Sequence, residues 1–271
     1  MNVIGKYAQK THPASRITTV DACEVGQKKH TMQALIEIDV TEARELIRET
    51  KMKGAKISFT AWLIKCISTV CEEYKLVHGV KNGKYKTVVF DDVDISILVE
   101  RDVHGENVPL PYVLRKTNEK SISDIYMEIK QAQQQPIKEE GDFVLGGGMK
   151  TFFMRAYYSL PGFVRRLFIS RLIMSPILTK KHMGTVVISS LGMMGRFNGW
   201  FVPISIHPMS FTIGSIVKKP GIIHDTIAIR EYLFVTVLID HDVIDGAPSA
   251  RALAKLIDLM EKGYGLESLT A

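Results

Sequence analysis

The sequence predicts a single domain of mixed α/β type, and three observations lead to this prediction. Apolar runs typical of strands occur at about residues 31–38, 93–99, 184–190, 210–217 and 232–239. Helical spacing of apolar residues is found between several of these runs. The 271 residues show no internal repeat, no low-complexity segment and no linker rich in Ala and Pro, so we expect one domain over residues 1–271.

The first predicted strand and helix follow a polar stretch, residues 1–29, that has no clear period. In residues 31–38 the apolar side chains approximately alternate with others, which indicates a strand. Thr41 precedes a run typical of a helix, so we expect it to be the N-cap of that helix. Gly54 is expected to end the helix.

The elements of the middle region are predicted from caps and turns. A second helix is expected to start at Ser58 or Thr60, and Asn82-Gly83 is expected to form the turn of a short hairpin. Ser121 is expected to cap a helix that runs to about residue 135. The apolar face of the second helix consists of Trp62, Leu63, Cys66, Ile67, Val70 and Cys71.

Residues 143–181 form a distinct apolar and basic segment. Pro161-Gly162 and Pro176 interrupt it, so we predict two amphipathic helices, at about residues 150–159 and 163–174. Three interpretations are open for this segment. It forms core or subunit interface, it forms a lid or wall for a long apolar acyl or acceptor group, or it lies in a membrane interface.

Composition sets limits on compartment and partners. The net charge of +6 favours an anionic partner such as a phosphorylated cofactor. Lys and Arg are spread along the chain, so we expect no nucleic-acid partner. Cys23, Cys66 and Cys71 form no CxxC pair, which argues against a zinc or redox motif. An odd number of thiols fits a reducing compartment, and neither a signal peptide nor a membrane-spanning segment is evident. We therefore expect a cytoplasmic protein.

The residues most suited to chemistry lie in the segment 240–246, between a predicted strand and the last predicted helix, at about residues 249–262. A loop held by rigid elements on both sides positions side chains well. His241 lies there beside carboxylates, and histidine is the commonest general base near neutral pH. Asp245 is placed to orient the loop, and Gly246 permits a backbone geometry that a side chain would obstruct. From spacing alone, a solvated or hydrogen-bonded loop histidine is the more usual interpretation.

The pattern His241-x-x-x-Asp245-Gly246 resembles the signature of chloramphenicol acetyltransferase and of the acyltransferase components of 2-oxo acid dehydrogenase complexes. Residues 240–247 are similar to the dehydrogenase-complex version, except that Asp242 stands where that family usually has Arg. Other segments resemble the family in the same order, and the resemblance covers about residues 16–262. These segments are residues 93–99, 108–109, 120–122, 184–192 and 201–204, followed by Pro208 and Gly214.

This resemblance implies a fold, an assembly and a reaction. The fold is a chloramphenicol acetyltransferase-like mixed β-sheet packed with helices, assembled as a homotrimer with active sites between subunits. Acyl-coenzyme A is the implied substrate, and no metal is implied. His241 removes the proton of the acceptor, which attacks the thioester directly, while Ser189 stabilises the tetrahedral oxyanion. Asp245 holds the loop through an ion pair, for which Arg16 is the expected partner.

Other residues are secondary candidates on the same grounds. Ser190 is the alternative to Ser189. His78 falls in a region that borders the acceptor channel in the family and is a candidate substrate contact. His207 lies in a loop that lines the family's site, but Ile206 stands where Asn is typical, so we expect a loop residue rather than a second base. Asp242 and Gly246 are expected to support the loop or contact substrate.

The implied acceptor is a thiol such as dihydrolipoamide. We recognise no lipoyl attachment site in the chain, so the acceptor is expected on a separate lipoyl-bearing protein. One alternative is an O- or N-acyltransferase of the chloramphenicol acetyltransferase type, acting on a small or lipid-like acceptor. A second alternative is a trimeric scaffold without catalysis. Retention of His241, Ser189, Asp245 and Gly246 together argues against the scaffold.

Overall fold

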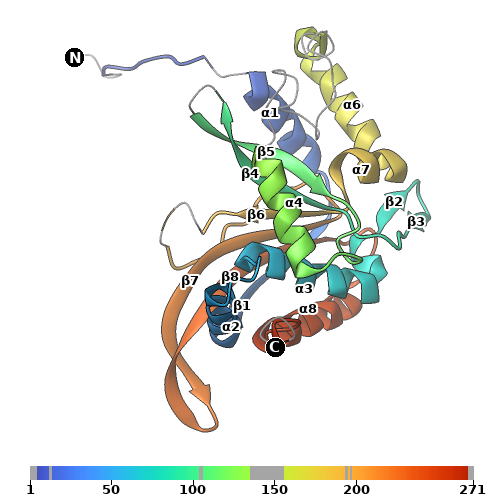
Figure 1. The fold of residues 1–271 in the computed structure, drawn as a ribbon. Coiled ribbons are helices and arrows are strands. Elements are labelled where there is room, and N and C mark those ends of the chain that lie inside the picture. Colours follow the sequence, from blue (N-terminus) through green and yellow to red (C-terminus); the bar gives the residue numbers. More distant parts are fainter. Residues whose placement is uncertain are drawn as a thin grey trace.

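The computed structural model describes residues 5–11, 14–103, 106–134, 156–192, 195 and 197–267. Figure 1 shows the fold. In chain order the elements are α1 (Ala14–Gly26), β1 (Thr31–Asp39), α2 (Thr41–Met52), α3 (Phe59–Glu73), the 3-10 helix η1 (Lys75–His78), β2 (Val80–Asn82), β3 (Lys86–Val88), β4 (Ile95–Val103), β5 (Glu106–Leu114), α4 (Ile122–Gln134), α6 (Gly162–Met174), α7 (Pro176–Met183), β6 (Val186–Ser190), β7 (Met209–Ile223), β8 (Thr226–Asp240) and α8 (Gly246–Glu261).

A six-stranded mixed sheet organises the molecule, with the order β1-β8-β7-β6-β4-β5. The pairs β4–β6 and β6–β7 are parallel, and the other three pairs are antiparallel. The strands β2 and β3 form a separate hairpin. This arrangement confirms the predicted mixed sheet packed with helices.

The hydrophobic core lies between one face of the sheet and the helices α2, α3, α4 and α8 (Figure 1). Trp62 of α3 is fully buried there, and its indole N–H donates to the carbonyl of Tyr264 at 3.0 Å. Val186 and Ile188 of β6 also face this core. Because side chains alternate along a strand, Val187 and Ser189 face the opposite side of the sheet.

Several predicted elements are confirmed with their caps. Ser58 is the N-cap of α3 and accepts from the amide of Ala61 at 3.1 Å. Ser121 and Asp124 form the reciprocal capping pair of α4, with the Asp124 amide donating to Ser121 Oγ at 3.1 Å. The predicted cap at Thr41 is wrong. Thr41 is the first residue of α2, and its amide and hydroxyl both donate to the Asp39 carboxylate, at 3.0 and 2.6 Å.

Two features differ from the prediction for reasons of tertiary packing. The sequence predicts no element in residues 1–29, yet α1 forms there and packs against α6, with Arg165 Nε 2.6 Å from the buried Asp21 carboxylate. The β7–β8 hairpin also extends well past residues 217 and 232. Its two-residue turn is formed by His224 and Asp225, both with positive φ, and the backbones of residues 218–223 and 226–231 pair in register.

The basic and apolar segment at 143–181 is only partly described. Its first part, residues 143–155, lies outside the described residues, and residues 156–159 are helical. The predicted helix at 163–174 is confirmed as α6, and α7 follows it after Ser175, whose hydroxyl caps it. Within the described ranges, no helix has the length and apolar character that a bilayer crossing requires.

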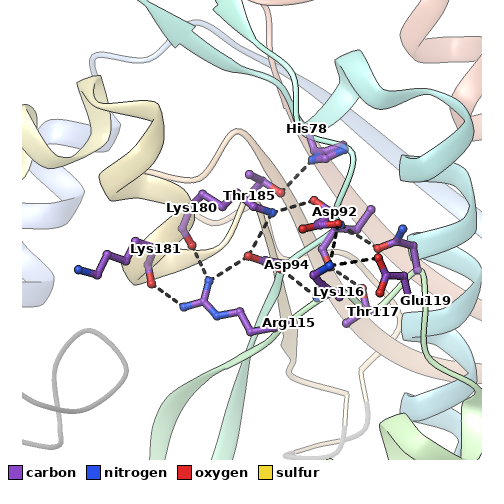
Figure 2. A network of polar contacts seen from close by, with 12 residues as sticks. His78, Asp92, Asp94, Arg115, Lys116, Thr117, Glu119, Lys180, Lys181 and Thr185 are labelled. Atoms are coloured by element: carbon purple, nitrogen blue, oxygen red, sulfur yellow. Dashed lines mark hydrogen bonds and ion pairs between the residues drawn. The ribbon is translucent and has the colours of Figure 1, made fainter.

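A buried carboxylate, Asp94, joins the edges of several elements at one end of the sheet (Figure 2). Its side chain is 5% exposed and accepts from Arg115 at 2.9 Å, from the Lys116 amide at 2.9 Å and from Lys180 of α7 at 3.1 Å. The turn from α7 to β6 is also constrained. Its Gly184 has φ +71°, and a side chain there would lie 2.7 Å from the carbonyl of Asp94. This network fixes α7 to the start of β4 and places β6 beside it.

Replacing Asp94 should therefore destabilise the protein strongly. Asp94→Ala leaves two cations and a backbone amide without their shared acceptor. We expect the free energy of unfolding to fall by about 3–5 kcal/mol, the usual loss when one partner of a buried ion pair is removed. Urea unfolding followed by circular dichroism measures this. Asp91→Ala, which removes an exposed partner of Lys75, is the matched control and should leave the midpoint nearly unchanged. Equal midpoints for the two variants would contradict the role of Asp94.

Candidate active site

Backbone hydrogen bonds hold the end of β8, where His241, the candidate base, follows the strand. The amide of Asp240 donates to the carbonyl of Pro208 at 3.0 Å, and the amide of His241 donates to the carbonyl of His30 at 2.7 Å. The Asp240 carboxylate is largely buried and pairs with Lys29 at 2.9 Å. The backbone at His241 is thus held from both sides, as a catalytic side chain requires.

The His241 imidazole is directed outward from this support, with 51% of its side chain exposed. Its Nδ1 lies 3.9 Å from Asp245 Oδ1, across the turn that leads into α8. Asp245 occupies the N-cap position of α8, but its side chain makes no capping hydrogen bond and is 89% exposed. The carboxylate is therefore available to orient the imidazole through Nδ1, which leaves Nε2 for a substrate proton.

Asp242 is bound by two partners from distant segments. Its carboxylate lies 2.8 Å from Lys81 Nζ and 2.9 Å from His30 Nδ1. The hydrogen bonds from Lys81 and from His30 lower the pKa of the Asp242 carboxyl. The negative charge beside His241 is thus balanced by a lysine, and His30 supports the loop with both its ring and its carbonyl. No local pattern in the sequence indicates a role for Lys81, because its contact with Asp242 depends on how the β2–β3 hairpin packs.

The two other candidate histidines are neutral supports in this chain. His207 Nε2 lies 3.3 Å from the Met183 carbonyl, and burial, reinforced by the charge of Lys29, lowers its pKa to about 4. His78 is fully buried, and its Nδ1 lies 2.9 Å from Thr185 Oγ1. Burial, reinforced by the charge of Lys180, lowers the pKa of His78 to about 4.

The segment that carries His78 also supports the His241 loop. The following residue, Gly79, packs so closely that an added side chain would lie 3.1 Å from Val243. Lys29 links the loop of His207 to the same region, because its ammonium donates to the carbonyls of Ile206 and His207 and pairs with Asp240. Both histidines therefore lie behind the loop rather than beside the exposed imidazole.

The two candidate serines face opposite sides of the sheet. Ser189 pairs in register with Thr212 of β7, which in turn pairs with Thr236 of β8. Side chains of directly paired residues point to the same face, so these three hydroxyls form a row on the face away from the core. Ser190 shares its face with Ile188, on the core side. The register therefore favours Ser189 as the hydroxyl that a substrate can reach.

One chain does not bring His241 and Ser189 together. The row that contains Ser189 meets β8 at Thr236, four residues before Asp240 at the end of that strand. Four residues correspond to about 13 Å along the strand, and the two strand spacings from β6 to β8 add about 10 Å across the sheet. A general base and an oxyanion donor must both contact the same reacting thioester, which is only a few ångströms across. His241 and Ser189 of one chain are too far apart for this, so a second chain would have to supply one of them.

The remaining candidates, Gly246 and Arg16, make no contact with His241 that the structure describes. Gly246 is the first residue of α8, and a Cβ added there would have no atom within 4 Å, so the prediction that a side chain would obstruct the backbone is wrong within one chain. Arg16 is exposed near the start of α1, and the ion pairs of the described residues do not include one between Arg16 and Asp245. No group of three or more His, Cys, Asp or Glu side chains suited to a metal ion occurs among the described residues.

Comparison with known proteins identifies similar catalytic domains. A family model described as 2-oxoacid dehydrogenases acyltransferase (catalytic domain) matches residues 14–140 and 178–266. The dihydrolipoyllysine-residue acetyltransferase component of the pyruvate dehydrogenase complex of Corynebacterium glutamicum is 24% identical over 265 residues, which cover 93% of this chain and 33% of that protein. The mitochondrial succinyltransferase component of the 2-oxoglutarate dehydrogenase complex of Bos taurus is 25% identical over 228 residues, or 81% of this chain and 41% of that protein. The chain thus spans well under half the length of these curated relatives.

Solved structures show the same fold. A probable dihydrolipoamide acetyltransferase from Listeria monocytogenes superposes with a TM-score of 0.66 at 20% identity, over 96% of this chain and 97% of that chain. The dihydrolipoamide acetyltransferase of Azotobacter vinelandii has a TM-score of 0.66 at 15% identity, over 100% of this chain and 98% of that chain. The family match leaves residues 141–177 unmatched, a stretch that overlaps the predicted insertion at 143–181.

The neutral state of the buried His78 and the half-buried His207 predicts a loss of stability in mild acid. Both pKa values are lowered to about 4 in the folded chain, from 6.5 when unperturbed. Below about pH 6.5 the unfolded chain binds protons that the folded chain does not accept, so the free energy of unfolding falls as pH decreases toward about 4. The slope is at most about 1.4 kcal/mol per pH unit for each histidine. Urea unfolding at a series of pH values measures it.

His78→Gln should remove about half of this pH dependence, since one of the two groups no longer titrates. His224→Asn, at the exposed hairpin turn, is the control and should leave the slope unchanged. A wild-type stability that is flat between about pH 7 and 5 would contradict the neutral state of these two side chains.

Proposed function

We propose that this chain, which belongs to the family of 2-oxoacid dehydrogenase acyltransferase catalytic domains, transfers an acyl group between coenzyme A and an acceptor thiol. The observation that carries the proposal is the exposed His241 imidazole, held by a fixed backbone and flanked by Asp245. The acceptor that fits the family is a dihydrolipoyl group, the group named in the matched relatives.

In the proposed reaction His241 Nε2 takes the proton of the acceptor thiol. The sulfur then attacks the thioester carbonyl carbon, the carbonyl π electrons move to oxygen, and an oxyanion forms. When the carbonyl re-forms, the bond to the coenzyme A sulfur breaks, and that sulfur takes the proton back from His241. Asp245 keeps Nδ1 protonated and the ring oriented, which stabilises the transient imidazolium. No acyl-enzyme and no metal enter this sequence.

Ser189 is the proposed donor to the oxyanion. Its position on the face away from the core supports this assignment over Ser190. The Azotobacter vinelandii enzyme was studied for the catalytic roles of a serine, a histidine and an asparagine. In that protein 52 positions separate the serine from the histidine, the same separation as between Ser189 and His241. Its asparagine follows the histidine by four positions, as Asp245 does here.

The complete site is proposed to form between subunits of a homotrimer, with His241 from one chain and Ser189 from the next. The separation of the two residues within one chain supports this arrangement. The far part of the β7–β8 hairpin provides further support, because Ile222, Ile227 and Ile229 are each at least 75% exposed. These side chains continue the core-facing side of the sheet beyond the helices that cover it. A fold neighbour forms the cubic core of a pyruvate dehydrogenase multienzyme complex.

The acceptor is proposed to arrive on a separate lipoyl-bearing protein. An O- or N-acyltransferase with a small or lipid-like acceptor uses the same base and the same oxyanion donor. Exposed apolar side chains on α6 and α7 favour this second candidate. Turnover of acyl-coenzyme A with free dihydrolipoamide, compared with hydroxyl and amine acceptors, separates the two.

His241→Ala should abolish most of the activity. Loss of the general base should lower kcat by about 10²–10⁴-fold, while KM for acyl-coenzyme A changes little. The measurement is release of free coenzyme A with dihydrolipoamide as acceptor. His182→Ala on α7 is the matched control and should retain wild-type turnover. If His241→Ala keeps full activity, the assignment of the base is wrong.

Ser189→Ala and Ser190→Ala distinguish the two candidate oxyanion donors. Removing one such donor costs about 10²–10³-fold in kcat. We expect that loss for Ser189→Ala and less than about threefold for Ser190→Ala, whose side chain faces the core. Steady-state kinetics of both variants at saturating acyl-coenzyme A decide the question. A large loss for Ser190→Ala alone would reverse the assignment.

A further inference from the structure

The outer surface of α6 and α7 carries large apolar side chains that the described chain leaves uncovered. Phe163 is 68% exposed and Ile177 is 73% exposed. Together with Leu160 before α6, the exposed set on these two helices is Leu160, Phe163, Leu167, Phe168, Met174, Ile177 and Leu178. Single exposed apolar residues are ordinary on protein surfaces, but a contiguous group of this size marks a surface that binds something.

The helix α6 buries Ile169 and Leu172, but it also presents a second apolar face that is exposed. Its two paired arginines, Arg165 and Arg166, are directed toward α1, where they bind Asp21 and Glu24 at 2.6–3.8 Å. Phe163, Leu167 and Met174 are spaced for one helical stripe, and all three are exposed. Both arginines thus form ion pairs within the chain, while the apolar stripe is exposed to solvent.

The charge around this stripe has one sign. The sequence contains no Asp or Glu from residue 143 to residue 224. Arg171 and Lys181 are exposed on α6 and α7, and no carboxylate of the described residues pairs with either side chain. Arg171 lies on the same stripe as Phe163 and Leu167, between two apolar turns. Among the described residues of α6 and α7, this surface is therefore apolar and carries only positive charges.

We propose that α6 and α7 bind the surface of an anionic lipid bilayer. Apolar side chains of such a surface enter the boundary between headgroups and acyl chains, and Arg and Lys reach the lipid phosphates. The helices have 13 and 8 residues and lie on the bilayer rather than cross it. A two-fold contact with a second copy fits less well, because it would bring Arg171 near its own symmetry mate.

If α6 and α7 bind a bilayer, the acyl transfer takes place at the membrane surface by the same chemical steps. In the trimer of the proposed function, three such surfaces would act together, so weak individual contacts give strong total binding. The bilayer contact itself does not require the trimer, and it does not require acyl transfer. A failure of one proposal therefore leaves the other testable.

Co-sedimentation of the full chain with vesicles tests the proposal. The probe is a set of phosphatidylcholine vesicles with and without about 30% phosphatidylglycerol, at low and high salt. We expect binding to the anionic vesicles that weakens with salt. Phe163→Ser/Leu167→Ser should lower the partition coefficient by about tenfold or more, because both side chains lose their transfer from water. Arg171→Glu should lower it by at least about fivefold, since one cation near such a surface contributes about 1 kcal/mol.

Met52→Ser/Tyr85→Ser is the matched control, since it removes two side chains that are each over 80% exposed on other elements. This control should bind vesicles as the wild type does. Circular dichroism and gel filtration of every variant report folding and assembly. Absence of binding to anionic vesicles, or equal binding by Phe163→Ser/Leu167→Ser, would overturn the proposal. A smaller assembly size for that variant would also overturn it, because a second copy would then cover the stripe.

Discussion

The hydrogen-bond register across β6, β7 and β8 is the constraint on which the rest of the site depends. It pairs Ser189 with Thr212 and Thr212 with Thr236, so the candidate oxyanion donor and His241 are far apart along the sheet. Backbone pairing fixes this separation, and no side-chain rotation can close it. The proposed acyl transfer, which needs both residues at one thioester, therefore calls for a second chain to complete each site.

The base itself is supported by charges that are balanced locally. Lys29 neutralises Asp240, and Lys81 neutralises Asp242, so the two acidic neighbours of His241 are engaged on either side of it. Among the described carboxylates of this loop, Asp245 is the one that lies near the imidazole, with Oδ1 3.9 Å from Nδ1. Lys81 on β2 thus balances the charge of Asp242. The carbonyl of His30 accepts a hydrogen bond from the His241 amide, and the ring of His30 contacts Asp242.

Much of the sheet was predictable, because its strands have apolar patterns and its helices have caps such as Ser58 and Ser121. The position of His241 was predictable from a motif at a strand end. Three features were not. The pair Lys81–Asp242 joins residues 161 positions apart, α1 depends on Arg165 for its packing, and the separation of Ser189 from His241 depends on strand register. Each is a tertiary property that no local pattern encodes.

Subunit complementation tests the central claim most directly. His241→Ala and Ser189→Ala chains are mixed in equal amounts, dissociated, reassembled together, and assayed for acyl transfer from acyl-coenzyme A to dihydrolipoamide. In a randomly mixed trimer with one His241 and one neighbouring Ser189 at each site, about a quarter of the sites are intact, so about a quarter of wild-type activity should return. Activity no higher than that of the parent variants would mean that both residues act from the same chain or that one of them is misassigned.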